Sequence, residues 1–117
     1  MVSSQLAGIQ LNNFFHFDSL GRDRDATGKF YLEFLRVPAL SAGVYVLAAG
    51  ASDPQKPHHE DELYYVVSGQ ARMQIGSEHS DVRTGSIIFV EAGREHRFYD
   101  IQEELQVLVF FAPAERE

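Results

Sequence analysis

With 117 residues, the chain has the size of one domain and leaves no room for a second hydrophobic core. Its 10 basic and 17 acidic residues give a net charge of −7, which repels phosphate backbones and argues against nucleic acid as a partner. The chain contains no cysteine, which excludes a thiol nucleophile, a disulfide and a thiolate metal site.

Residues 1–29 are interpreted as an N-terminal arm and loop. Residues 1–20 mix apolar and polar side chains without a clear period, and both a short helix and a strand remain open. The polar stretch from Gly21 to Gly28 predicts an exposed turn or loop. The start of the chain lacks the basic and apolar regions of a signal peptide, and no run approaches the roughly 18 apolar residues of a membrane span. We therefore expect a cytoplasmic protein that does not bind membranes.

From Phe30 onward, the chain is a succession of short apolar runs rich in valine, isoleucine, phenylalanine and tyrosine, separated by turn residues. Eight runs have the length of strands: 30–37, 44–49, 62–67, 71–75, 81–84, 87–90, 96–101 and 105–111. No segment has a convincing 3.6-residue period over ten residues. The spacing of these strands predicts an all-β sandwich or closed barrel over residues 30–112, followed by a polar tail at residues 113–117.

Two histidines and one glutamate form a candidate metal site. Alternate side chains of a strand share a face, so His58 and Glu62 are expected to point together, whereas His59 faces the other way unless a bulge intervenes. His96 begins another strand-like run. A carboxylate buried alone is costly, and a cation bound between it and two imidazoles removes that cost. The pattern therefore predicts a divalent metal bound by His58, Glu62 and His96. The competing interpretation is a polar network without metal.

Tyr64 is the candidate catalytic residue because it shares a strand face with Glu62. Its hydroxyl could bond to a substrate oxygen or act as an acid, and the alternative is simple core packing. We expect the interior to be lined by Tyr64, Met73, Phe89 and Phe98 and to bind a small organic molecule.

Two segments of the chain resemble the paired motifs of the cupin family. Gly50 to Gly69 reads G-x5-K-x-H-x3-E-x6-G, which is similar to the first cupin motif, G-x5-H-x-H-x3/4-E-x6-G. After a spacer of 15 residues, Gly85 to Asp100 reads G-x5-E-x-G-x2-H-x3-D and resembles the second motif, G-x5-P-x-G-x2-H-x3-N. Glu91 and Asp100 replace the proline and asparagine of that motif. Both motifs in order at this spacing identify the chain as a small single-domain cupin.

The resemblance implies an all-β jelly-roll barrel of antiparallel strands, with a divalent metal held inside by three histidines and one glutamate. The implied ligands in this chain are His58, Glu62 and His96. Lys56 stands where the family has its first histidine, which puts the fourth ligand in doubt. Three interpretations remain open: a His2Glu set with open positions, a distorted strand that brings His59 inward, and a metal-free site in which Lys56 pairs with Glu62.

Imidazole and carboxylate ligands suit divalent Fe, Mn, Ni, Co or Zn and do not choose among them. The candidate functions are a dioxygenase-like or isomerase-like enzyme, a non-catalytic module that binds a small ligand, and a metal-free dimeric scaffold. The fold alone does not decide between them. The resemblance also implies a homodimer, whose exposed sheet edge could be covered by apolar residues of the N-terminal arm. These residues are Ile9, Leu11, Phe14 and Phe15.

Overall fold

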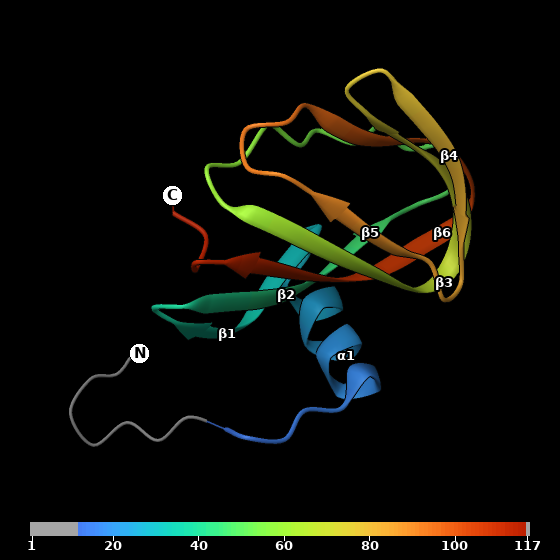
Figure 1. Ribbon diagram of the computed structural model, residues 1–117. Helices are drawn as coiled ribbons and strands as arrows, with labels where there is room; N and C mark the ends of the chain where they lie inside the picture. The colour runs from blue at the N-terminus through green and yellow to red at the C-terminus, as the bar shows by residue number, and fades with distance from the viewer. Residues whose placement is uncertain (1–11, 117) are drawn as a thin grey trace.

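The computed structural model describes residues 12–116, which form one helix and six strands (Figure 1). The elements are α1 (Phe17–Thr27), β1 (Tyr31–Val37), β2 (Leu40–Leu47), β3 (Asp61–Ile75), β4 (Glu78–Arg83), β5 (Ile87–Val90) and β6 (His96–Ala112). The strand order is β1-β2-β6-β3-β4, with β5 also paired to β3, and these pairings are antiparallel. The all-β jelly-roll prediction is confirmed, although the sheet does not close.

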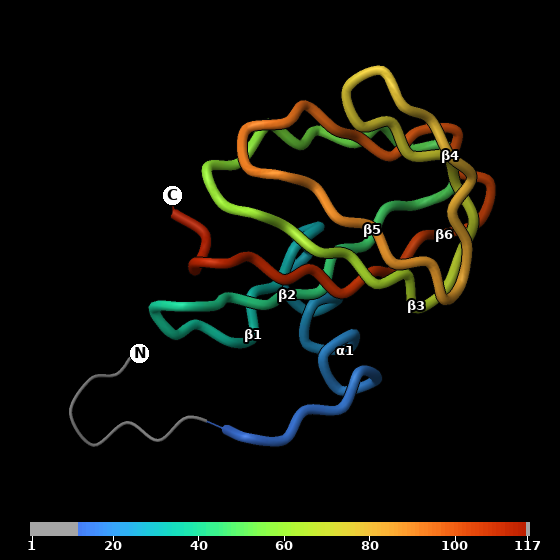
Figure 2. Tube along the Cα trace, viewed as in Figure 1, coloured from blue at the N-terminus to red at the C-terminus, as the bar shows by residue number. Residues whose placement is uncertain are grey.

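Strands β3 and β6 are each longer than expected. They pair along almost their whole lengths, from Asp61 opposite Ala112 to Ile75 opposite His96. The sequence predicts four shorter strands here, at 62–67, 71–75, 96–101 and 105–111. The structure joins these pieces because register shifts between Val66 and Arg72 let the paired strands bend without separating (Figure 2).

The bend contains two residues with positive φ. Gly69 has φ of 110°, and a Cβ there would lie 2.3 Å from the carbonyl oxygen of Glu104, so only glycine fits. Asp100 has φ of 49° in the bulged part of β6. Aspartate and asparagine tolerate this left-handed conformation better than most residues, which explains how Asp100 replaces the motif asparagine.

Helix α1 corrects the sequence prediction for residues 21–28, which we expected to form a loop. The helix continues to Thr27, and Gly28 ends it with φ of 71°. Leu20 is its one buried residue and packs with Val44 and Val46 of β2. Because so few of its side chains are buried, the helix does not require apolar residues at regular helical spacing. The sequence therefore carries little sign of it. Within residues 12–116, no helix is long and apolar enough to cross a membrane.

The main core fills the space between the curved strands. Side chains of β3 alternate between exposed and buried from Asp61 to Val66, which points Glu62 and Tyr64 inward. Tyr64, Met73 and Phe98 are buried as expected. Phe89 is 60% exposed, so its predicted place in the interior is wrong. It lies on the outer face of β5, whose inward positions are the alternate residues.

Candidate metal centre

Three side chains from separate parts of the fold converge at one point. His58, Glu62 and His96 each offer a ligand atom, and these atoms lie within 4.8 Å of one another. Glu62 points inward from β3, and His96 is the first residue of β6. His58 lies in the loop before β3, not on a strand as expected, and its carbonyl accepts a hydrogen bond of 2.7 Å from the Gly93 amide. The turn before β6 therefore holds the loop that carries His58.

The His58 ring is oriented by a second carboxylate. Its Nδ1 lies 3.0 Å from Oε2 of Glu115. This interaction raises the pKa of the His58 imidazole above its ordinary value, against the opposing effect of burial. The other ring nitrogen, Nε2, is buried and has no hydrogen-bond partner within residues 12–116. Nε2 is thus the nitrogen of His58 that remains available to a ligand or metal.

The His96 ring is oriented in a similar way. Its Nδ1 lies 2.9 Å from the carbonyl oxygen of Arg94, which can only accept, so Nδ1 carries a proton. Nε2 lies 3.1 Å from Oε1 of Glu62, and the geometry is not that of a hydrogen bond. A neutral His96 ring would therefore direct its lone pair at a carboxylate. Either a proton on Nε2 or a shared cation removes this repulsion.

The electrostatics of the pair agree with this geometry. Burial lowers the pKa of the His96 imidazole, but the Glu62 carboxylate and the Arg94 carbonyl outweigh it, and the pKa lies above its ordinary value. Both oxygens of Glu62 are buried without a hydrogen-bond partner among the described residues. A buried carboxylate in this state is destabilising unless a positive charge compensates it.

The donor set fits a divalent transition metal. Four buried atoms converge without hydrogen-bond partners in the described part of the chain: Nε2 of His58, Nε2 of His96 and both oxygens of Glu62. Imidazole nitrogens and carboxylate oxygens are preferred ligands of first-row divalent metals. Metal-binding histidines also commonly direct their second nitrogen at a carboxylate or a backbone carbonyl, as His58 does toward Glu115 and His96 toward the Arg94 carbonyl.

A cavity of about 160 Å³ adjoins this group. It is lined by Tyr31, Tyr45, Gln55, His58, Glu62, Val109, Phe111 and Glu115. The cavity thus combines two of the three candidate ligands with an apolar wall and several polar groups, as small-molecule sites usually do.

The chain matches the model of a family described as "Cupin domain" over residues 43–111. The protein is a cupin. It is 48% identical over 101 residues to the uncharacterized protein SCO3923 of Streptomyces coelicolor, a match that covers 86% of this chain and 96% of the relative. The sequence prediction of a small cupin is therefore confirmed.

Solved cupin-fold structures agree with the architecture. BH2720 from Bacillus halodurans has a TM-score of 0.75 and 19% identity, over 91% of this chain and 85% of that one. KdgF from Halomonas sp. has a TM-score of 0.66 and 20% identity, over 74% and 78% of the two chains. At these identities the structures support a common fold and not a common activity.

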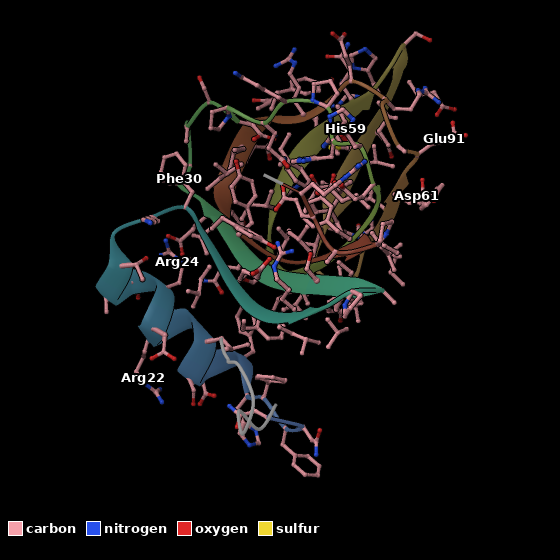
Figure 3. All side chains as sticks on the ribbon, turned by 90° about the vertical axis from the view of Figure 1, so that its left-hand side faces the viewer. Arg22, Arg24, Phe30, His59, Asp61 and Glu91 are labelled. Carbon is pink, nitrogen blue, oxygen red and sulfur yellow. The ribbon has the colours of Figure 1, made fainter. Side chains whose placement is uncertain are left out.

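The loop before β3 departs from the family motif in an unexpected way. Lys56 and His59 are both exposed, and neither belongs to the converging group. His59 is labelled in Figure 3. The structure also shows no ion pair between Lys56 and Glu62. Gln55 lines the cavity instead, one residue before the position of the missing histidine. No sequence pattern predicts this position of Gln55, because an irregular loop has no period that would fix the direction of its side chains.

Tyr64 lies behind Gln55 and does not line the cavity. Its side chain is fully buried, and its hydroxyl donates a hydrogen bond of 2.8 Å to Oε1 of Gln55. The amide nitrogen of Gln55 in turn donates to Oδ2 of Asp53 at 2.9 Å. Burial and the negative charge of Glu62 raise the pKa of Tyr64 well above its ordinary value. This placement corresponds to the core-packing interpretation of Tyr64.

The C-terminal segment, which the sequence predicts only as a polar tail, packs against the rest of the fold. Ala114 is buried, and the amide of Glu115 donates to the hydroxyl of Ser41 at 2.9 Å. Arg116 donates from its backbone and side chain to the buried carboxylate of Glu60, at 3.2 Å and 3.0 Å. These contacts hold Glu115 beside His58. A single glutamate near the end of the sequence carries no pattern that predicts such a position.

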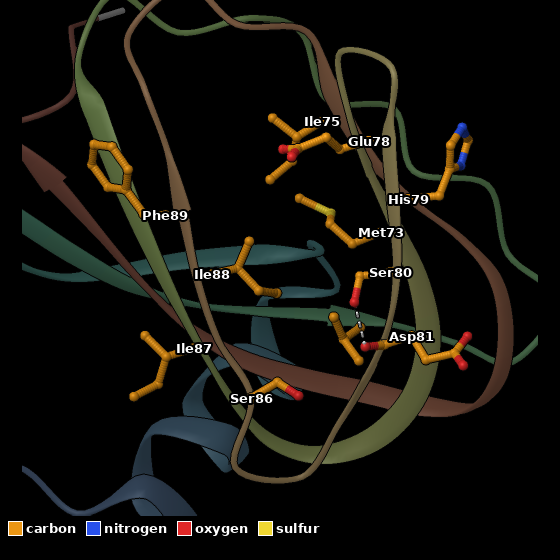
Figure 4. A pocket seen from close by; sticks show the side chains of 11 residues that line it. Met73, Ile75, Glu78, His79, Ser80, Asp81, Ser86, Ile87, Ile88 and Phe89 are labelled. Atoms are coloured by element: carbon orange, nitrogen blue, oxygen red, sulfur yellow. Dashed lines mark hydrogen bonds between the residues drawn. The ribbon is translucent and has the colours of Figure 1, made fainter.

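A larger cavity, of about 420 Å³, opens between β3, β4 and β5 (Figure 4). Its lining includes the apolar side chains of Met73 and Ile88 and the polar side chains of Glu78 and His79. None of the three converging residues lines it. The smaller cavity, and not this one, adjoins the candidate metal ligands.

Proposed function

We propose that this cupin binds one divalent transition metal through His58, Glu62 and His96 and uses it to act on a small molecule in the adjoining cavity. The observation that supports the proposal is the convergence of these buried ligand atoms without hydrogen bonds. Both imidazoles already use Nδ1 elsewhere, so each presents Nε2 to the shared point. A structural polar network would be expected to satisfy these atoms within the protein.

Each part of the site has a distinct role in this proposal. Glu115 and the Arg94 carbonyl fix the tautomers of His58 and His96, and Glu62 supplies negative charge. Phe111 contacts the His58 ring, with centroids 4.8 Å apart, and restricts the access of water. A metal bound by three protein ligands would polarise a ligand oxygen at an open position.

The proposal includes two reaction classes that differ in the metal. A set of two histidines and one carboxylate is used by non-haem Fe(II) oxygenases, so with iron we propose a dioxygenase-like reaction. With a metal that does not change its oxidation state, such as zinc, we propose an isomerase-like reaction. Oxygen consumption by the iron-loaded protein in the presence of small carbonyl compounds distinguishes the two.

Elemental analysis of natively purified protein tests the metal site. We expect about one transition metal per chain in the wild type, and loss of that metal in His96→Ala. His79→Ala is the matched control because His79 is exposed and lies outside the converging group. A wild type that contains no metal and takes up none of Fe, Mn, Ni, Co or Zn would contradict the proposal. Ligand affinity that survives His58→Ala without turnover would instead identify a non-catalytic binding module.

We also propose a homodimer. The outer face of β3 and β5 exposes four apolar side chains that pair across the strands, Leu63 with Phe89 and Tyr65 with Ile87. Clusters of this kind mark interaction surfaces more often than isolated exposed residues do. Of the arm residues named earlier, Ile9 and Leu11 lie outside the described part of the chain. Phe15 packs against Phe34 of its own chain.

A further inference from the structure

The space for the Tyr31 side chain is created by a glycine on the neighbouring strand. Tyr31 is the first residue of β1, and its ring lies directly over Gly43 of β2. A Cβ atom at Gly43 would lie 2.2 Å from Cζ of Tyr31 and 2.3 Å from its hydroxyl oxygen. Any other residue at position 43 would therefore displace the phenol. Gly43 has no positive φ, so this close approach is the structural reason for a glycine there.

The Tyr31 hydroxyl differs from the other phenols around the site. Tyr45 donates to Oδ1 of Asp53 at 2.7 Å, and Tyr64 donates to Gln55. The hydroxyl of Tyr31 is buried, and it has no hydrogen-bond partner within residues 12–116. The Tyr31 side chain also lines the cavity that contains His58 and Glu62. Buried hydroxyls in proteins are nearly always hydrogen-bonded, so this group points to a partner that enters the cavity.

Tyr31 is suited to act as a donor. Burial raises the pKa of its phenol far above the ordinary value, and the nearby charges of Glu115, Glu33 and Glu62 raise it further. The group therefore keeps its proton throughout the physiological pH range. A protonated phenol without a partner donates most readily to a carbonyl, hydroxyl or metal-bound oxygen.

The size and charge of the cavity limit the ligand. A cavity of about 160 Å³ is close to the roughly 150 Å³ that accommodates one benzene molecule. The lining includes the carboxylates of Glu62 and Glu115 and no lysine or arginine from the described residues. A second anionic group on the ligand would meet these carboxylates without a cation to pair with. The site therefore favours a compact molecule with oxygen donors and no additional carboxylate or phosphate.

We infer that Tyr31 donates a hydrogen bond to an oxygen of a compact oxygen-donor ligand held in this cavity, one without an additional carboxylate or phosphate, and that Gly43 positions its phenol for this contact. The inference rests on the proposed function, because the ligand is taken to bind next to the metal. It assigns Tyr31 a role in substrate binding, separate from the metal ligands.

Titration calorimetry with acetohydroxamic acid on zinc-loaded protein tests this inference. Acetohydroxamic acid is a compact oxygen chelator that is neutral in solution, loses one proton when it chelates a metal, and carries no further acidic group. We expect Tyr31→Phe to weaken its binding about tenfold while the zinc content stays unchanged, because the variant loses one hydrogen bond to a metal-bound oxygen. Tyr45→Phe is the matched control, since its hydroxyl also lies in the cavity wall but already donates to Asp53. We expect it to change the affinity less than about threefold.

Gly43→Ala provides a second variant, which retains the Tyr31 hydroxyl and displaces it. Like Tyr31→Phe, it is expected to lower the affinity for acetohydroxamic acid without lowering the zinc content. The monohydroxamate of malonic acid, which adds a free carboxylate to the same chelating group, is expected to bind the wild type about tenfold more weakly.

The results separate this inference from the proposed function. If the wild type takes up no metal, the proposed function fails and the inference fails with it. If zinc uptake is complete but Tyr31→Phe binds acetohydroxamic acid as tightly as the wild type, the inference alone is overturned. Equal losses in Tyr31→Phe and Tyr45→Phe would also overturn it.

Discussion

Oε2 of Glu115, in the segment that follows β6, lies 3.0 Å from Nδ1 of His58, in the loop that precedes β3. The contact joins the end of the described chain to the candidate metal centre. A carboxylate at this position fixes the imidazole tautomer and makes the opposite nitrogen a stronger ligand. Glu115 thus has a positioning role in the proposed site.

Glu115→Gln should weaken metal binding by about 10-fold to 100-fold, because the neutral amide no longer increases the basicity of His58. The backbone hydrogen bond from residue 115 to Ser41 remains in this variant, so the segment should stay in place. Competition with a chromophoric chelator for zinc measures the affinity. Glu103→Gln, which neutralises an exposed glutamate elsewhere, is the control and should bind zinc like the wild type. Equal zinc affinities for Glu115→Gln and wild type would exclude the positioning role.

The protonation of the two site histidines should make both the stability of the metal-free protein and the stabilisation by zinc depend on pH. The Glu115 contact raises the pKa of His58, and that of His96 is raised by Glu62 and the Arg94 carbonyl despite burial. Since the folded state then binds these protons more tightly than the unfolded chain, their stabilising effect is complete below the ordinary histidine pKa of 6.5. It is lost as the pH rises through the folded-state pKa values.

The Tm of the metal-free protein should therefore contain a contribution that decreases from pH of about 6 to about 8. Zinc competes with the same protons, so the increase in Tm that zinc causes should grow over this interval. Thermal denaturation with zinc or with EDTA measures both effects, and His96→Gln should diminish both. A zinc-induced increase in Tm that is constant with pH would contradict the protonation scheme.

The convergence of the three motif residues depends largely on local geometry, which the sequence pattern carries. The position of Glu62 follows from the alternation of side chains along β3, and His96 begins β6 on the same inward face as Phe98. The positions of Tyr31 and Glu115 depend on how β1 and the C-terminal segment pack against distant strands. Such contacts leave no period in the sequence.

The helix and the long strands show the same distinction. Runs of strand residues were recognised, but their continuity through Gly69 and Asp100 depends on bulges that bend β3 and β6 together. In α1, a single buried leucine, Leu20, is sufficient to dock the helix on β2. Tertiary packing therefore outweighed the local pattern in both places.

The proposed dimer predicts that a charge on the outer face of β5 will dissociate the protein. Ile87 is 69% exposed and lies opposite Tyr65 in the pairing of β3 with β5. We expect light scattering to give twice the mass of one chain for the wild type, and the mass of one chain for Ile87→Asp, because burying an unpaired carboxylate in an apolar interface is unfavourable. Thr84→Asp, at an exposed polar position, should remain dimeric. A monomeric wild type would reject the dimer.

Two glycine substitutions should change stability in opposite directions. Gly69→Ala should destabilise the fold by about 2–4 kcal/mol, since alanine is strained at positive φ and its Cβ would collide with the backbone of Glu104. Gly21→Ala should stabilise it by about 0.5–1 kcal/mol, because Gly21 lies within α1 and a Cβ there meets no atom within 4 Å. Urea denaturation of both variants measures these changes.

Because Gly69 lies where β3 and β6 bend, Gly69→Ala should also reduce zinc affinity, whereas Gly21→Ala should leave it unchanged. A Gly69→Ala protein with wild-type stability would mean that the bend does not require the left-handed conformation at that residue.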